Sequence, residues 1–160
     1  MTPSEDRALR KFNTAEYIDM LCTLVDGGAR CALPVSGGSM APFLSGGRDS
    51  VCIEAPRGGI RRGDIVLYRR RSGQYVLHRC LRVMPDGSFD AVGDAQTQIE
   101  RGIPAGSVCA VACSAVRRGR EISAGSPVWE LFRVWWLLLL PVRGTLLRLY
   151  GRLRRRDEEG

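Results

Sequence analysis

The fold class is decided by two strand-like runs in the middle of the chain, Ile65-Val66-Leu67-Tyr68 and Tyr75-Val76-Leu77-His78-Arg79-Cys80-Leu81-Arg82-Val83. Residues 69–73 between them are polar and end in glycine, which is typical of a turn. Pro85-Asp86-Gly87 then marks a second turn, which leads into another apolar run at residues 89–92. Strand-like runs that follow one another through such short turns predict an antiparallel sheet.

The same alternation extends the sheet in both directions. We expect further strands at residues 32–35, 50–54, 108–116 and 121–123. A helix is expected near the N-terminus, capped by Asn13 or Thr14 and ended by Gly27-Gly28. Its apolar residues at helical spacing are Tyr17, Met20, Leu21, Leu24 and Val25. The sequence therefore predicts a mainly β, antiparallel, partly closed barrel-like fold with an N-terminal helix and a hydrophobic C-terminal helix.

Composition limits the possible function classes. The 160 residues carry 24 Lys and Arg against 17 Asp and Glu, a formal charge of +7. Apart from a C-terminal cluster, the arginines are spread along the chain and lack interleaved aromatic residues, which argues against nucleic acid as a partner. Six cysteines without a CxxC pair, beside one histidine, argue against a zinc site. We expect reduced thiols, no metal and no cofactor.

A glycine-rich loop supplies the candidate nucleophile: Ser36-Gly37-Gly38-Ser39-Met40-Ala41-Pro42. Glycines let main-chain N–H groups point at a ligand, although such a loop is also the usual composition of a turn. A serine attacks a carbonyl only when a neighbouring base takes its proton. The chain has one histidine, His78, and one lysine, Lys11, which lies before any strand pattern. In a serine hydrolase of this sequence, His78 is therefore the expected base.

Four ordered motifs carry a family resemblance. They are Ser39-Met40-Ala41-Pro42, Arg62-Gly63-Asp64-Ile65-Val66, His78-Arg79 and Gly93-Asp94. Their order resembles that of the type I signal peptidases, whose wider clan includes self-cleaving repressor proteases. Histidine in the third motif is similar to the endoplasmic-reticulum and sporulation-type branch. The resemblance covers residues 33–121 and implies a signal-peptidase-type protease fold.

The resemblance implies a serine endopeptidase that cleaves a leader or precursor peptide through an acyl-enzyme on Ser39, with His78 as the base. The backbone N–H of Ser39 is the first candidate donor to the oxyanion. The family's common second donor, a serine hydroxyl, falls on Gly37 in this chain. Either the Ser36 hydroxyl reaches the oxyanion, or the backbone N–H of Gly37 or Gly38 replaces it, and we favour the backbone.

The carboxylate that orients the imidazole has two candidates. Asp94 matches the Gly-Asp motif, whereas the histidine branch uses an acid six residues further on, which falls on Glu100 without a gap. Each also has a structural reading, Asp94 as a turn residue and Glu100 as a solvated loop charge. We take Asp64 as a turn residue that binds backbone N–H groups. The resemblance further implies a substrate bound as an extended strand, with Met40 and Pro42 beside shallow pockets for small residues.

The C-terminal region combines apolar residues and arginines. Residues 134–142 are uncharged and apolar, too few for the ~20 residues of a membrane span, and Pro141 and Arg143 interrupt the pattern. We expect residues 128–156 to lie on an anionic membrane surface. A helix buried on the domain or in a dimer, and a tilted span, are the alternatives.

The expected organisation is an N-terminal segment at 1–30, a peptidase domain at 31–125 and a tail at 126–160. Without an export signal, we expect the domain in the cytoplasm and associated with the membrane through its tail. Two other functions stay open. A self-cleaving regulator of the repressor type needs a DNA-binding domain, which about thirty preceding residues do not supply. A catalytically impaired peptide-binding module is suggested by Gly37 and the unsettled carboxylate.

Overall fold

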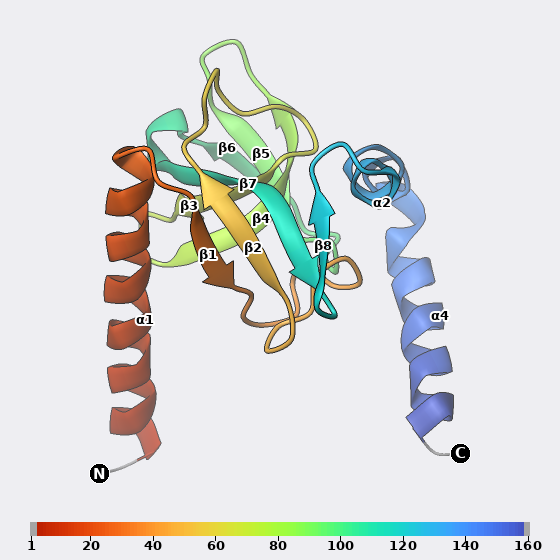
Figure 1. Cartoon of the computed structure of the whole chain (residues 1–160). Helices are drawn as coiled ribbons and strands as arrows, with labels where there is room; N and C mark the ends of the chain where they lie inside the picture. The colour runs from red at the N-terminus through yellow and green to blue at the C-terminus, as the bar shows by residue number, and fades with distance from the viewer. Residues whose placement is uncertain (1–2, 159–160) are drawn as a thin grey trace.

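A computed structural model describes residues 3–158, with the side chains of residues 14–149 and of Arg152. A twisted sheet forms its centre, flanked on one side by helix α1 (Pro3–Asp26) and on the other by a helical C-terminal segment (Figure 1). The outer ends of both flanking helices extend beyond the sheet in the same direction.

All strand pairings are antiparallel, so the predicted mainly β, antiparallel fold with flanking helices is confirmed. The strands run in the order β1-β2-β7-β3-β4-β5-β6, with β8 paired to β7. Because β1 and β6 lie at its two ends, the sheet does not close, unlike the partly closed barrel expected. The elements of this part of the chain are β1 (Cys31–Pro34), β2 (Ser50–Glu54), β3 (Ile65–Arg69), β4 (Tyr75–Val83), β5 (Phe89–Val92), β6 (Glu100–Ile103), η1 (Ala105–Ser107), β7 (Val108–Arg117) and β8 (Arg120–Ser123).

Strand β3 runs through the centre of the core and is buried on both faces. Alternation along the strand sends Ile65 and Leu67 into one apolar cluster and Val66 and Tyr68 into another. Breaks in register between β3 and β7, and between β4 and β5, mark β-bulges, which increase local twist. The two apolar clusters thus lie on opposite faces of β3, and His78 of β4, which pairs with Val66, lies on the face of Tyr68.

Helix α1 differs from the expected one at its start. It begins at Pro3, so Asn13 and Thr14 lie inside the helix and the predicted cap there is wrong. Its N-terminal residues are mostly good helix formers, which explains the extension. Within the expected apolar face, Leu21 and Val25 are buried, whereas the other three residues (Tyr17, Met20, Leu24) are exposed.

The C-terminal segment is helical and partly buried on the domain. It comprises α2 (Pro127–Glu130), η2 (Leu131–Trp135), α3 (Trp136–Leu138) and α4 (Leu140–Glu158). Trp129 and Leu137 are each 3% exposed. Phe43, which follows the serine loop, meets the Trp129 ring edge-on at 5.7 Å and the Phe132 ring at 4.8 Å. The segment is thus an integral part of the core as well as a tail.

The C-terminal segment also packs closely against the main chain at Gly63. A side-chain Cβ at Gly63 would lie 2.3 Å from Cγ and 2.8 Å from the carbonyl oxygen of Arg133. Only glycine permits this contact between the Arg-Gly-Asp turn and η2. Among the described residues, none of the helices has the length and apolar character needed to cross a bilayer.

Candidate active site

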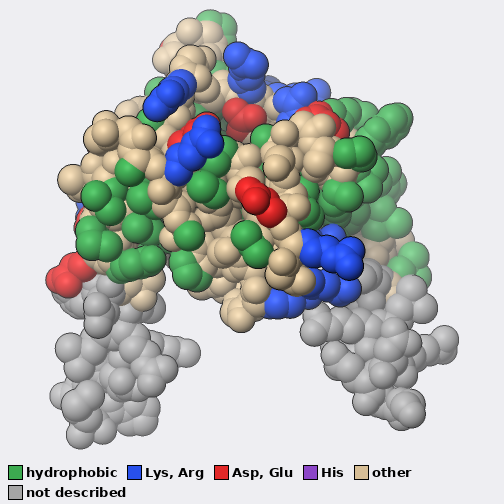
Figure 2. Space-filling model, in the orientation of Figure 1, with side chains coloured by type: hydrophobic (Ala, Val, Ile, Leu, Met, Phe, Trp, Pro, Cys, Tyr) green, Lys and Arg blue, Asp and Glu red, His purple; other side chains and the backbone are tan. Residues whose placement is uncertain are grey.

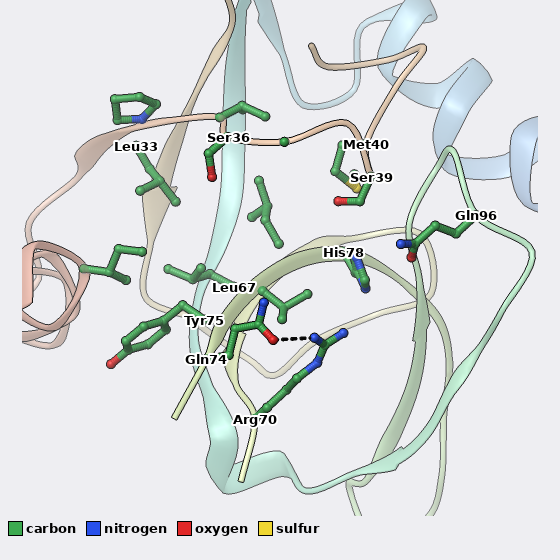
Figure 3. Close-up of a pocket in the computed structure, with 16 residues that line it drawn as sticks. Leu33, Ser36, Ser39, Met40, Leu67, Arg70, Gln74, Tyr75, His78 and Gln96 are labelled. Atoms are coloured by element: carbon green, nitrogen blue, oxygen red, sulfur yellow. Dashed lines mark hydrogen bonds between the residues drawn. The ribbon is translucent and has the colours of Figure 1, made fainter. Parts of the chain in front are cut away.

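Ser39 and His78 line the same pocket, of about 340 Å³. Ser39 comes from the loop after β1 and His78 from the middle of β4. Figure 3 shows Ser39 on the loop that covers the pocket, His78 on the strand below it, and Gln96 beside them. The two residues that the sequence nominated as nucleophile and base therefore share one cavity, although 38 positions separate them in the chain.

The serine loop is held by close backbone contacts. Gly37 has a φ of +70°, and its carbonyl accepts a hydrogen bond of 3.1 Å from the N–H of Gly46. A Cβ at Gly46 would lie 2.2 Å from that carbonyl oxygen. Both positions thus need glycine, one for its backbone angle and the other for space.

The Gly-Asp motif supports the loop from its other side. The N–H of Ala95 donates to the Ser39 carbonyl at 2.8 Å, and a Cβ at Gly93 would lie 2.6 Å from the same oxygen. This packing places the main chain of the Gly-Asp motif directly against the candidate nucleophile. Glycine at position 93 is required by this contact rather than by a turn.

The imidazole of His78 is 3% exposed and presents Nδ1 to two oxygens. Nδ1 lies 3.3 Å from the hydroxyl of Tyr68 and 3.4 Å from Oε1 of Glu100. Nε2 has no hydrogen-bond partner among the described residues. An N–H at Nδ1 facing the carboxylate leaves Nε2 as the basic nitrogen, which is the tautomer that a general base needs.

Burial sets the protonation state of His78. Desolvation lowers its pKa below 6.5, and the nearby guanidinium of Arg70 lowers it further. The carboxylate of Glu100, and more weakly that of Asp94, act in the opposite direction without reversing the shift. The imidazole is therefore neutral at neutral pH and able to accept a proton.

Glu100 is fixed as a carboxylate by Arg70. It begins strand β6 and is half-buried, so the reading as a solvated loop charge is wrong. Burial acts to raise its pKa, but the hydrogen bonds and charge of Arg70 outweigh this effect and the net pKa is lowered. Arg70 donates from Nε at 3.0 Å and from Nη2, and also reaches Gln74 at 2.7 Å.

Asp94 has a different environment. Its carboxylate is fully buried and receives Nε and Nη2 of Arg79 at 2.8 and 2.7 Å, a bidentate ion pair. Arg79 also donates to the carbonyl of Gly63 at 3.0 Å. This arrangement joins the Arg-Gly-Asp, His-Arg and Gly-Asp motifs through one guanidinium. Of the two candidate carboxylates, Glu100 lies at the imidazole and Asp94 at Arg79.

The turn assigned to Asp64 is confirmed, because its carboxylate accepts the N–H of Arg61 at 2.8 Å. Of the remaining candidates, Ser36, Gly37 and Met40 line the pocket. Met40 is only 2% exposed and thus forms part of the core as well as the pocket wall. Gly38 and Pro42 are not in the lining; the carbonyl of Pro42 instead accepts a hydrogen bond from Arg117 at 3.0 Å.

The serine loop contains main-chain N–H groups without an acceptor in the part of the chain that the structure describes. None of the backbone N–H groups of residues 36–40 donates to another described residue. Within the same described part of the chain, the Ser39 hydroxyl forms no hydrogen bond. Nucleophile–base contacts are often long in ligand-free enzymes and shorten when substrate binds. The loop therefore has both a free hydroxyl and free main-chain donors at the pocket.

Sequence reasoning missed three polar residues around this site. Tyr68 and Arg70 were assigned to a strand end and a turn, yet the β3–β4 register, Val66 opposite His78, places Tyr68 on the imidazole's face. Arg143 was treated as an interruption of an apolar run. It is fully buried and donates to the carbonyls of Gly93, Gln96 and Trp136 at 3.2, 3.2 and 2.6 Å.

No group of three or more His, Cys, Asp and Glu residues suited to a metal ion occurs in the described part of the chain. Comparison of the chain with protein-family models, with curated proteins and with solved structures gives no match.

Proposed function

We propose that the chain is a serine endopeptidase of the signal-peptidase type, with the corresponding protease fold, that cleaves a leader or precursor peptide. The observation that carries this proposal is the convergence on one pocket of a free serine hydroxyl and a buried neutral imidazole whose Nδ1 faces a carboxylate. These are the parts of a nucleophile, base and orienting acid.

In the proposed reaction, Ser39 Oγ attacks the peptide carbonyl while His78 Nε2 takes its proton. Glu100 holds the Nδ1–H and stabilises the imidazolium that forms. Main-chain N–H groups of the serine loop, beginning with that of Ser39, bind the oxyanion. His78 then returns the proton to the leaving amine, and water hydrolyses the acyl-enzyme by the reverse sequence.

An edge strand supports the proposed extended substrate. β1 lies at the end of the sheet, so one side of it is free of strand partners among the described elements, and its residues Leu33 and Pro34 line the pocket. A second cavity, of about 670 Å³, shares Ile18, Ser36, Gln74 and Tyr75 with the first. The combined groove runs from the catalytic pair toward α1, a suitable path for a peptide added beside β1.

Peptide cleavage tests this function. A peptide library with small residues in many sequence contexts is incubated with wild type, Ser39→Ala and His78→Ala, and new termini are identified by mass spectrometry. Ser123→Ala, which alters an exposed serine on β8 outside the pocket, serves as the serine control. We expect cleavage by wild type and Ser123→Ala, and its loss in the other two variants. Identical cleavage by Ser39→Ala would contradict the proposal, and a pure binding module would retain peptides without any new termini.

A further inference from the structure

The C-terminal helical segment has two apolar faces, of which only one is covered. The inner face contributes Trp129 and Leu137 to the interior and is fixed to the Gly-Asp motif by Arg143. The other face carries large apolar side chains at intervals of three and four residues that remain exposed. These residues, here named the outer stripe, are Leu131, Trp135, Leu138, Val142, Leu146 and Leu149.

The residues of the outer stripe are exposed to solvent. Trp135 is 62% exposed and Leu138 is 53% exposed, although a folded protein normally turns such residues inward. Figure 2 shows hydrophobic side chains gathered on the side of the molecule where the C-terminal helices lie. Exposed apolar side chains gathered in this way are typical of a membrane or protein contact.

The charge of the C-terminal segment favours an anionic binding partner for the outer stripe. Arg148 and Arg152 are exposed on α4, and residues 154–156 continue the basic run with three more arginines. Between residues 131 and 156 the sequence has no acidic residue. Basic residues beside an apolar stripe favour anionic lipid headgroups, and an exposed tryptophan is suited to the headgroup level.

A second copy of the chain fits this surface less well. A symmetric pair formed through the outer stripe would bring two basic runs into one assembly, and each chain already carries a net charge of +7. A lipid surface instead supplies both an apolar layer and compensating negative charge. We propose that the outer stripe binds the surface of an anionic bilayer, with the C-terminal helices lying in the plane of the interface.

The inner face gives this contact an orienting role. Arg143 binds the carbonyls of Gly93 and Gln96, and the N–H of Ala95 binds the Ser39 carbonyl. The Trp136 indole also donates to the Asp94 carbonyl at 2.9 Å. Because the bound helices are hydrogen-bonded to these loops, a docked chain would hold its pocket at one orientation to the lipid surface.

Vesicle flotation tests the proposal without reference to catalysis. The full chain is mixed with phosphatidylcholine vesicles, with or without phosphatidylglycerol, and its partition coefficient is measured. We expect binding to the anionic vesicles and much weaker binding to the neutral ones. Trp135→Ser/Leu138→Ser should lower the partition coefficient at least about tenfold. The matched control Val83→Ser/Val116→Ser, which alters exposed apolar residues outside the tail, should stay within about twofold of wild type.

A charge variant and a mass measurement complete the test. Arg148→Gln/Arg152→Gln should weaken binding to anionic vesicles about tenfold or more and leave binding to neutral vesicles unchanged. Equal flotation of wild type and Trp135→Ser/Leu138→Ser would overturn the proposal, as would failure of the wild type to float with anionic vesicles. A third outcome would also overturn the proposal: the wild type is a dimer, Trp135→Ser/Leu138→Ser is a monomer, and neither binds vesicles. The outer stripe would then be a contact between copies of the chain.

Discussion

Nδ1 of His78 lies 3.4 Å from Oε1 of Glu100. The other candidate for the orienting acid, Asp94 of the Gly-Asp motif, pairs with Arg79 instead. Arg70 binds both oxygens of the Glu100 carboxylate, so the group can neither rotate freely nor easily become protonated. The contact gives the single histidine an orienting acid.

Glu100→Gln tests this contact. We expect kcat to fall by about two to four orders of magnitude with little change in KM, because the amide can favour the wrong imidazole tautomer. Peptide hydrolysis assays measure both constants. Glu121→Gln, which alters an exposed carboxylate on β8, is the control. Wild-type kcat in Glu100→Gln would remove Glu100 from the site.

The contact between His78 and Glu100 also predicts how the pH dependence of kcat/KM changes in Glu100→Gln. Burial lowers the pKa of His78, so the acid limb of kcat/KM for wild type should lie below pH 6.5. Glu100 partly offsets burial, and its loss should lower the pKa of His78 further. The acid limb of the residual activity in Glu100→Gln should therefore move to lower pH. A shift to higher pH would contradict the assignment.

Asp94→Asn should affect stability first. The substitution leaves the buried guanidinium of Arg79 without its charged partner, which costs about 3–5 kcal/mol. Urea unfolding measures this loss in the free energy of unfolding. If the variant instead has wild-type stability and loses kcat as severely as Glu100→Gln, Asp94 acts in catalysis and the two carboxylates have been assigned the wrong way round.

Ser36→Ala separates the two candidate oxyanion donors. The main-chain N–H groups of residues 36–40 have no acceptor among the described residues, so removal of the Ser36 hydroxyl should leave kcat within about twofold. Loss of a true oxyanion donor costs roughly 2.7–4 kcal/mol, or about 10²–10³ in kcat. A decrease of that size, with normal thermal unfolding, would assign the role to the hydroxyl.

Gly63→Ala tests the docking of the tail. The new methyl group would meet both the side chain and the backbone of Arg133, in addition to the strain of a φ of +90°. Gly58→Ala is a matched control, because Gly58 has a φ of +80° and open space around its Cβ position. We expect about 1–2 kcal/mol of destabilisation in the control and at least about 1–3 kcal/mol more at Gly63. Equal unfolding free energies would show that η2 does not pack there.

Sequence alone predicted much of the sheet because its signals are local. Alternating apolar residues and glycine-containing turns gave β4 and β5 with the bounds that the structure has. Strand β6, Glu100-Arg101-Gly102-Ile103, was missed because it lacks an apolar alternation and depends on pairing with β5. The predicted helix begins later than α1 because the first residues of α1 are charged and present no apolar face.

The part of the site that could be predicted depends on residue types that are rare in the chain. A single histidine and an ordered set of motifs nominated Ser39 and His78, which the fold brings to one pocket. Tyr68 reaches the imidazole only through the pairing of β3 with β4, and Arg70 follows directly after β3. Glu100 reaches the site because β6 pairs with β5 and because Arg70 binds its carboxylate. Arg143 had no signal of this kind, because the carbonyls that it binds become neighbours only after the tail has packed.

Reaction with a fluorophosphonate tests the central claim most directly, since it reports whether Ser39 is activated by His78 before any substrate is known. Peptide mass mapping locates the adduct. We predict a single phosphonyl group on Ser39 in the wild type, and its loss in both Ser39→Ala and His78→Ala. Labelling of both variants at the wild-type rate, or an adduct on a different residue, would contradict the account.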